Sequence, residues 1–135
     1  MTRILVVDSE FQKYQAYLEP RFPEVDFTYA ANGEEALIHV PETEVIISIA
    51  RWFTREMAQK AKNLKWVQCN ITGTDHLLEP LSCREDIILT NARGIHGPQM
   101  TEITLLHMLA LYRQVGRLAK NQATHTWDQF LPYVL

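Results

Sequence analysis

A short polar segment, ITGTD at residues 71–75, contains residue types that can bind an anion, and it directly follows an apolar run. Successive backbone N–H groups in a turn at the carboxyl end of a strand hold a carboxylate well, and glycine permits both the backbone angles and the close approach of the ligand. The segment is therefore a candidate anion-binding loop, with Thr72, Gly73 and Thr74 as its binding residues. The alternative is a tight turn in which Asp75 caps the next helix.

Arg51 is a second group suited to a carboxylate, because its planar guanidinium can pair with both carboxylate oxygens at once. It lies just past the apolar run at 45–49. If that run forms the strand next to the one that precedes residues 71–75, Arg51 reaches the same crevice. The alternative is an arginine that is solvated at the surface.

The cysteine and histidine pattern favours no metal site. Cys69 and Cys83 form neither a CxxC pair nor a metal-like spacing to histidine. His76, His96 and His107 share no helical spacing suited to a metal. The sequence also offers no complete catalytic set, so we predict neither metal ligands nor catalytic residues in this chain.

The composition is that of a globular protein with a substantial core: 135 residues, of which 47% are hydrophobic and 21% charged, with a net charge of -3. Charges of both signs are interspersed, and no basic run is interleaved with aromatic residues, so nucleic acid and anionic membranes are not expected partners. No apolar run approaches the roughly 20 residues that cross a bilayer, and the N-terminus does not resemble a secretion signal. We therefore expect a cytoplasmic protein.

Short apolar runs rich in β-branched residues alternate with helical patterns over the first 90 residues or so. The runs lack a clean polar alternation, which is typical of strands covered on both faces of a parallel sheet. They predict strands at 4–7, 25–29, 45–49, 66–69 and 87–89, helices at 11–18, 34–40 and 54–61 with Thr54 as a cap, and a weaker helical or irregular stretch at 75–84. The expected fold is α/β, a flavodoxin-like, right-handed, doubly wound parallel five-stranded sheet with ligand contacts at the carboxyl ends of the strands.

The pattern changes after the fifth predicted strand. The segment NARGIHGPQ at 91–99 predicts a hinge, with Pro98 placed to start a helix. A long linking helix is expected from Met100 to about Lys120, and it is apolar nearly all round, so it should be buried against something. We predict a domain at 1–97, a hinge and helix at 98–135, and association of copies through the helix at 100–120 into a homo-oligomer, such as a dimer.

Two N-terminal segments, RILVVDSEFQ and YAANGEEAL, resemble a bacterial response-regulator receiver domain. Asp8 and Glu10 partly match the acidic cluster of that family. No aspartate lies from Phe27 through Thr74, however, so the conventional phosphate acceptor is absent. The fifth predicted strand leads to Thr90 and Asn91, whereas a lysine follows this strand in receiver domains. A degenerate receiver domain remains as an alternative.

The second half carries a more specific resemblance. NLKWVQCNITGTDHLL at 63–78 and IILTNARGIHGPQMTEITLLHMLALYRQ at 87–114 resemble the N-terminal part of the NAD-dependent D-isomer-specific 2-hydroxyacid dehydrogenases, in particular the branch acting on glyoxylate and hydroxypyruvate. Gly73 and Asp75 match the family's Gly-x-Gly-Val-Asp loop, whereas Ile71 replaces its first glycine and Thr74 its valine. The resemblance implies that the loop, with Arg51, binds a small 2-oxo or 2-hydroxy acid.

The same resemblance implies a nicotinamide cofactor, NAD or NADP, bound in a separate Rossmann domain. The five glycines of this chain form no G-x-G-x-x-G turn. We therefore expect a substrate-binding domain truncated before the cofactor fingerprint, an oxidoreductase by family that is inactive alone and binds no cofactor tightly. By resemblance, Met100 and Thr104 face the cofactor. A second alternative is a non-catalytic binding or dimerisation module derived from this family.

Overall fold

The computed structural model describes residues 1–131. Contacts divide the chain into two compact units, one ending at Arg93 and the other beginning at Gly94. This division falls within the predicted hinge at 91–99, as does the predicted domain boundary after residue 97. Each unit is described by itself.

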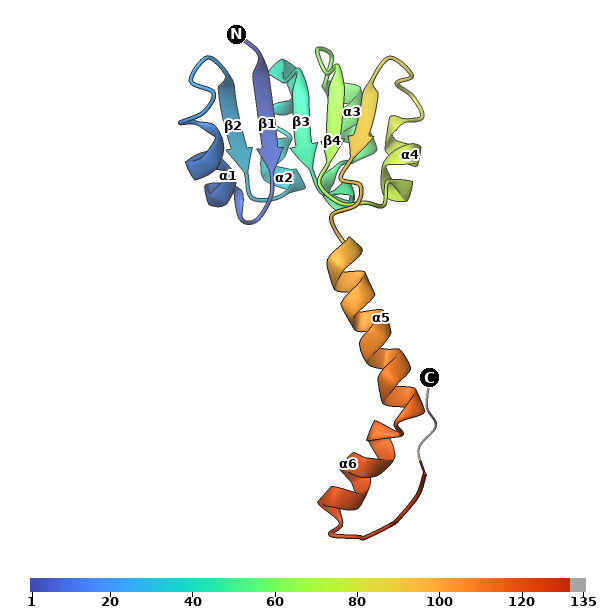
Figure 1. Cartoon of the computed structure of the whole chain (residues 1–135). Helices are drawn as coiled ribbons and strands as arrows, with labels where there is room; N and C mark the ends of the chain where they lie inside the picture. The colour runs from blue at the N-terminus through green and yellow to red at the C-terminus, as the bar shows by residue number, and fades with distance from the viewer. Residues whose placement is uncertain (132–135) are drawn as a thin grey trace. The chain divides into compact units, whose positions relative to one another are not determined.

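The first unit is a five-stranded, all-parallel sheet with helices between successive strands (Figure 1). In chain order its elements are β1 (Arg3–Val7), α1 (Phe11–Leu18), β2 (Asp26–Ala30), α2 (Gly33–Ala36), the 3-10 turn η1 (Val40–Glu42), β3 (Val45–Ser48), the 3-10 turn η2 (Ala50–Trp52), α3 (Arg55–Lys60), β4 (Trp66–Cys69), α4 (Asp75–Leu81) and β5 (Ile88–Asn91). The strand order is β2-β1-β3-β4-β5. This is the order of flavodoxin-like sheets, so the predicted fold class is confirmed.

The sheet register brings all five strand ends to one edge. Val7 is paired with Ala30 and with Ser48, Ser48 with Cys69, and Cys69 with Asn91. The residues that follow these positions therefore share the carboxyl edge of the sheet, where open α/β sheets bind ligands.

The core lies mainly on one face of the sheet. Leu5, Ile46 and Val67 are buried there, and they pack in one cluster with side chains of α2, α3 and α4 that include Ala36, Met57 and Leu77. Helix α1 covers part of the opposite face, where the Phe11 ring stacks on the Tyr29 ring at 5.9 Å. Coverage of both faces was predicted for all strands, but this is wrong at β4 and β5, where Trp66 and Ile88 are 38% and 64% exposed.

Local signals explain several helix ends. The Thr54 hydroxyl accepts a hydrogen bond from the Met57 N–H at 3.2 Å, so the predicted cap of α3 is confirmed. Helix α2 ends at Ala36, whereas the sequence predicted a helix to residue 40. A turn at residues 37–39 follows α2 and leads into η1, which has Pro41 in its first turn.

The second unit contains α5 (Gly97–Tyr112) and α6 (Val115–Ala123). Pro98 lies in the first turn of α5, as predicted. The prediction of one helix from 100 to 120 is wrong, because Gln114 adopts a left-handed conformation with φ of 53° and separates two helices.

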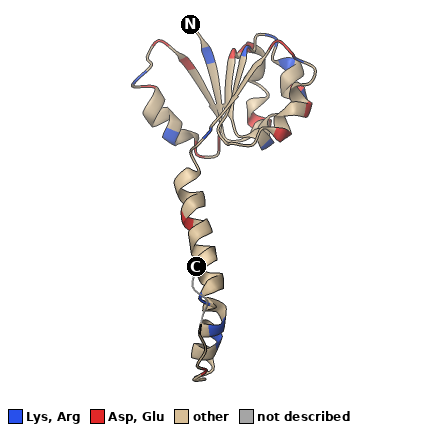
Figure 2. Cartoon of the chain, turned by 45° about the vertical axis from the view of Figure 1, so that its right-hand side comes forward, with Lys and Arg blue, Asp and Glu red and all other residues tan. Residues whose placement is uncertain are grey.

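Among Asp, Glu, Lys and Arg, helix α5 contains Glu102 alone (Figure 2). The sequence predicted that the apolar helix is buried. Neither α5 nor α6 contains a buried residue, so this burial is not found within residues 1–131. Within residues 1–131, no helix has both the length and the apolar character needed to cross a membrane.

Candidate functional site

The loop after β4 is tied to the end of β5. The Thr72 hydroxyl donates to the Ala92 carbonyl at 3.0 Å, and the Asn91 side-chain amide donates to the Thr72 carbonyl at 2.6 Å. The Asn70 N–H donates to the Ser48 carbonyl at the end of β3 at 2.9 Å. The loop at 70–74 is therefore anchored to both strands that neighbour β4.

Three successive backbone N–H groups of this loop have no acceptor within residues 1–131. Among the hydrogen bonds of residues 1–131, none uses the N–H of Thr72, Gly73 or Thr74 as donor. Thr72 and Gly73 are exposed and Thr74 is partly exposed. The three residues predicted to hold a carboxylate thus lie together, at the carboxyl edge of the sheet, with donors that nothing in the described chain occupies.

Gly73 differs from its prediction in one respect. Its φ does not lie in the left-handed region, so the loop does not require glycine for its backbone angles. A Cβ added there would meet only the Asp75 carboxylate, at an ordinary 3.8 Å. The glycine therefore leaves open space beside the loop backbone, which suits the close approach of a ligand.

Asp75 does not cap α4, as the tight-turn alternative would require. The cap position is Thr74, which makes no side-chain cap hydrogen bond, and Asp75 is the first residue of the helix. A carboxylate in the first turn favours the helix through its dipole.

The loop also contacts α1, through residues that sequence reasoning missed. The Asn70 side-chain amide donates to the Tyr14 hydroxyl at 3.0 Å, and the Tyr14 hydroxyl makes a longer contact of 3.4 Å with Asp8. Burial and, next, the charge of Asp8 raise the pKa of Tyr14 above its usual value. The Asp8 carboxylate accepts from the Glu10 N–H at 2.9 Å, so it closes the turn before α1. A polar residue directly after a buried strand was the available signal for Asn70.

Arg51 lies in η2, after β3, and lines a groove of about 460 Å³ between η2 and the start of α2. Its guanidinium lies 5.1 Å from the centre of the Trp52 ring, and within residues 1–131 it forms no salt bridge. The groove also contains the carboxylates of Glu34 and Glu56, but none of the loop residues 72–74. Arg51 and the loop therefore follow neighbouring strands, yet the structure does not bring them into one pocket.

The two predicted cofactor residues lie in the second unit, one turn apart on α5. The Thr104 hydroxyl donates to the Met100 carbonyl at 2.6 Å, so its hydrogen-bonding capacity is partly used within the helix. Both side chains are exposed.

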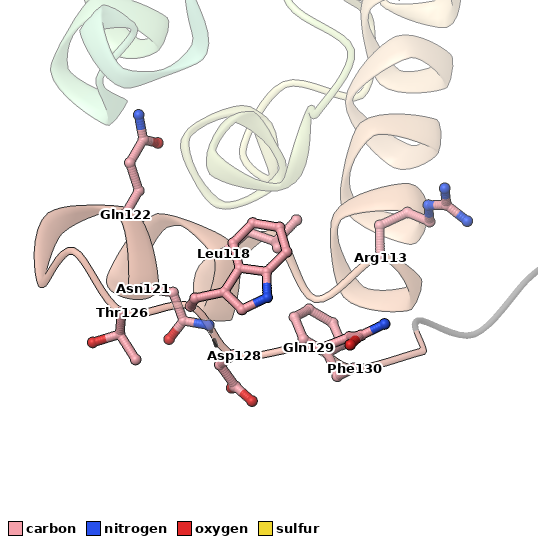
Figure 3. A pocket seen from close by; sticks show the side chains of 9 residues that line it. Arg113, Leu118, Asn121, Gln122, Thr126, Asp128, Gln129 and Phe130 are labelled. Atoms are coloured by element: carbon pink, nitrogen blue, oxygen red, sulfur yellow. Dashed lines mark hydrogen bonds between the residues drawn. The ribbon is translucent and has the colours of Figure 1, made fainter.

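A separate hollow of about 450 Å³ lies in the second unit, between α6 and residues 126–130 (Figure 3). Arg117 pairs with Asp128 at 2.6 Å, and the Asn121 amide donates to the same carboxylate at 3.3 Å. Hydrogen bonds from Arg117, and next from Asn121, hold the pKa of Asp128 below its usual value. No sequence pattern indicated this contact. Among the described residues no cluster of three metal-ligating side chains is present.

These features define an α/β protein with a flavodoxin-like sheet, at whose carboxyl edge a loop has three backbone N–H groups without an acceptor in residues 1–131. The model of the D-isomer specific 2-hydroxyacid dehydrogenase catalytic domain matches residues 4–128. The chain belongs to this family, as the resemblance indicated, and the family match accounts for its flavodoxin-like sheet without a receiver domain.

Relatives of known identity agree with this assignment. D-3-phosphoglycerate dehydrogenase of Methanocaldococcus jannaschii is 25% identical over 130 residues, which are 96% of this chain and 25% of that protein. A crystal structure of a D-isomer specific 2-hydroxyacid dehydrogenase family protein from Aeromonas salmonicida superposes with a TM-score of 0.85 at 28% identity, over 97% of this chain and 42% of that one.

More distant structures share the fold. D-lactate dehydrogenase of Aquifex aeolicus, solved with NAD and lactic acid, has a TM-score of 0.75 at 16% identity and covers 95% of this chain and 39% of its own. NAD-dependent formate dehydrogenase of Staphylococcus aureus, solved with NAD, has a TM-score of 0.68 at 23% identity, over 94% of this chain and 42% of that one. This chain therefore spans less than half the length of these relatives.

Proposed function

We propose that residues 1–93 form the substrate-binding part of an NAD- or NADP-dependent D-2-hydroxyacid dehydrogenase and hold a small 2-oxo or 2-hydroxy acid by its carboxylate. The observation that supports this proposal is the set of unoccupied N–H donors at Thr72, Gly73 and Thr74. Successive backbone donors at the carboxyl edge of a parallel sheet suit a carboxylate, because they supply fixed partial positive charges without a counter-ion.

An NMR titration of the 135-residue chain with glyoxylate tests the proposal. We expect the backbone amide signals of residues 72–74 to move with saturation, and the amide pyruvamide, which lacks a carboxylate, to leave them in place. Gly73→Ala should keep the fold, since its Cβ meets only an ordinary contact at 3.8 Å. It should weaken glyoxylate binding about tenfold, because the added methyl group fills open space beside these donors and the hydrogen bonds to the charged ligand lengthen. Equal binding by wild type and Gly73→Ala would place the carboxylate elsewhere.

We propose Arg51 as a second group that binds the ligand carboxylate, and its test must separate its effect from that of the loop at residues 72–74. Its guanidinium forms no salt bridge in the described chain, which leaves it available to a ligand. Arg51→Lys keeps the charge but loses the bidentate geometry. We expect Arg51→Lys to weaken glyoxylate binding several-fold with unchanged amide shifts at residues 72–74. An equal loss in Arg51→Met would show that the bidentate geometry matters and the charge does not, whereas wild-type affinity in both variants would show that Arg51 does not bind the ligand.

The described residues do not fit a dinucleotide by themselves. The glycines at 33, 73, 94, 97 and 116 form no G-x-G-x-x-G turn between a strand and a helix, which is the element that lets a pyrophosphate approach backbone N–H groups. We therefore propose Met100 and Thr104 only as residues that adjoin a cofactor bound by other parts of a whole enzyme, and we assign them no step.

We also propose that the 135-residue chain by itself catalyses no reduction. We expect the purified chain, mixed with NADH and either glyoxylate or hydroxypyruvate, to oxidise NADH no faster than the mixture without protein. The absorbance of the nicotinamide band measures this rate. A measurable rate that is lost in Gly73→Ala would overturn this statement and would at the same time support the carboxylate site.

A dimerisation module is the second candidate function, and helix α5 is the observation that favours it. Large apolar side chains of α5 are exposed, among them Leu105, Leu106 and Leu109. Helices that are apolar all round are normally buried. Sedimentation of the chain at micromolar concentration should show a dimer that Leu106→Glu converts to monomer, whereas a monomer at all concentrations would exclude association through this helix.

A further inference from the structure

We propose that Tyr14 is a positioning residue for the loop at residues 70–74, which is proposed to bind the ligand carboxylate. Its hydroxyl holds the Asn70 side chain and so fixes the direction of the N–H groups of residues 72–74. This inference rests on the proposed function of that loop, and it concerns a residue on α1, far away in sequence. Tyr14 touches no substrate in this account, and it acts only through Asn70.

The contact joins two elements that have no other hydrogen bond between them in residues 1–131. Asn70 is the first residue after β4, and its side-chain amide reaches the Tyr14 hydroxyl at 3.0 Å across 56 positions of sequence. The Asn70 main chain is held separately, by its N–H on the Ser48 carbonyl at 2.9 Å. The backbone bond fixes where Asn70 lies, and the Tyr14 bond fixes how its side chain is turned.

The direction of these hydrogen bonds follows from Asp8. An ionised carboxylate only accepts, so the Tyr14 hydroxyl donates its proton toward Asp8 and is left as acceptor for Asn70. The Asp8 carboxylate is itself fixed by the Glu10 N–H at 2.9 Å. The chain of contacts from the β1–α1 turn to the loop therefore has one consistent set of donors and acceptors.

The loop beyond Asn70 has its other anchor at β5, through Thr72. Without the Tyr14 contact, the Asn70 side chain would be free to turn. The segment between Asn70 and Thr72 would keep only main-chain hydrogen bonds, from the Asn70 N–H to Ser48 and a longer one of 3.4 Å from the Ala92 N–H to the Ile71 carbonyl. All of Asp8, Tyr14 and Asn70 are partly buried, so water replaces a lost partner incompletely. A less ordered loop presents its N–H groups to a carboxylate less often in the binding geometry.

A double-mutant cycle in the 135-residue chain tests this inference, with Tyr14→Phe, Asn70→Ala and both together. We expect each single variant to weaken glyoxylate binding about fivefold, the loss expected for one hydrogen bond. The double variant should bind as each single does, because Tyr14 acts through Asn70. Wild-type affinity in Tyr14→Phe, or losses that multiply in the double variant, would overturn the proposal.

Thr43→Val is the matched control. Thr43 is buried and its hydroxyl donates to the His39 carbonyl at 2.9 Å, but it precedes β3 and so lies at the opposite edge of the sheet. This variant removes one hydroxyl as Tyr14→Phe does. It should lower the urea midpoint and leave glyoxylate affinity within about twofold, since the loop keeps its anchors. A loss of affinity equal to that of Tyr14→Phe would show general destabilisation and would overturn the positioning role.

The order of the loop gives a readout that does not depend on glyoxylate. Heteronuclear NOE values of the amides of residues 72–74 report motion on the ps–ns timescale. They should fall in Tyr14→Phe and stay at wild-type values in Thr43→Val. If wild type binds no glyoxylate but these values fall only in Tyr14→Phe, the proposed function fails and the positioning role holds; unchanged values in Tyr14→Phe overturn the positioning role.

Discussion

The two units of this chain use apolar residues in opposite ways. In residues 1–93, short β-branched strands and three helices bury a continuous cluster on one face of the sheet. The helices that follow residue 93 contain no buried residue, although the middle of α5 is more uniformly apolar than any helix of the first unit. Hydrophobicity alone therefore does not make a core.

The difference lies in geometry. A sheet of five parallel strands offers a broad surface, and each crossover returns a helix to it, so every apolar side chain of the inner face finds neighbours from several elements. An apolar helix that is followed by one short polar helix has no such surface within its own unit. Substitutions that are matched between the two units should therefore differ in cost.

The largest difference is expected for leucine truncation. Leu5 in β1 is fully buried, whereas Leu106 in α5 is 59% exposed. Leu5→Ala should lower the free energy of unfolding by about 3 kcal/mol, because it removes buried methyl groups and leaves a cavity. Leu106→Ala should change it by less than about 0.5 kcal/mol. Urea unfolding followed by circular dichroism measures both, and equal losses would contradict the contrast between the units.

The second difference is expected for two arginines. Arg84 donates to the carbonyls of Ala58, Ala61 and Leu64, at 3.2, 2.8 and 3.2 Å, and so satisfies the end of α3. Arg84→Met should cost about 2 kcal/mol of unfolding free energy, because these carbonyls lose a charged donor.

Arg117→Met is the matched substitution in the second unit. Arg117 pairs with Asp128, and both side chains are more than a third exposed, so solvent screens the pair and it contributes little to stability. The urea midpoint of the first unit should stay unchanged, while the NMR signals of residues 126–130 shift. A midpoint that falls as far as in Arg84→Met would show that the second unit stabilises the first.

The third difference is expected for two glycines. A Cβ at Gly33 would lie 2.6 Å from the Trp52 carbonyl oxygen, whereas a Cβ at Gly116 in α6 meets no atom within 4 Å. Gly33→Ala should cost about 1–2 kcal/mol, at the lower end for overpacking because the short helix α2 can shift. Gly116→Ala should be neutral or slightly stabilising, since alanine is the better helix former. Thermal melts of both variants check this, and a neutral Gly33→Ala would show that η2 yields freely.

The sequence predicted those elements whose signals are local. Helix α1 and strand β4 have the predicted bounds, 11–18 and 66–69, because an apolar run bounded by polar turns determines them. The loop at residues 72–74 was also predicted, since its glycine and its place after a strand are visible in the sequence.

What the sequence did not predict depends on tertiary contacts or on single backbone angles. The contact between Tyr14 and Asn70 joins residues 56 positions apart, and no periodic pattern marks it. The break between α5 and α6 arises from the positive φ of Gln114, a conformation for which glycine is the usual signal. The family resemblance indicated the class of ligand, but it indicated none of the side chains that hold the loop.

The smallest effect expected is a difference in acid response between two aspartates. Hydrogen bonds from Arg84 hold the pKa of Asp86 below its usual value, and Arg117 does the same for Asp128. A carboxyl whose pKa is lower in the folded state stabilises that state above the unfolded pKa, and the contribution is lost as pH falls from about 4 through the folded pKa. The urea midpoint of the first unit should therefore fall less steeply with acid in Asp86→Asn than in wild type. Asp128→Asn should leave that slope unchanged and alter only the acid shifts of residues 126–130, because its arginine belongs to the unit without a core.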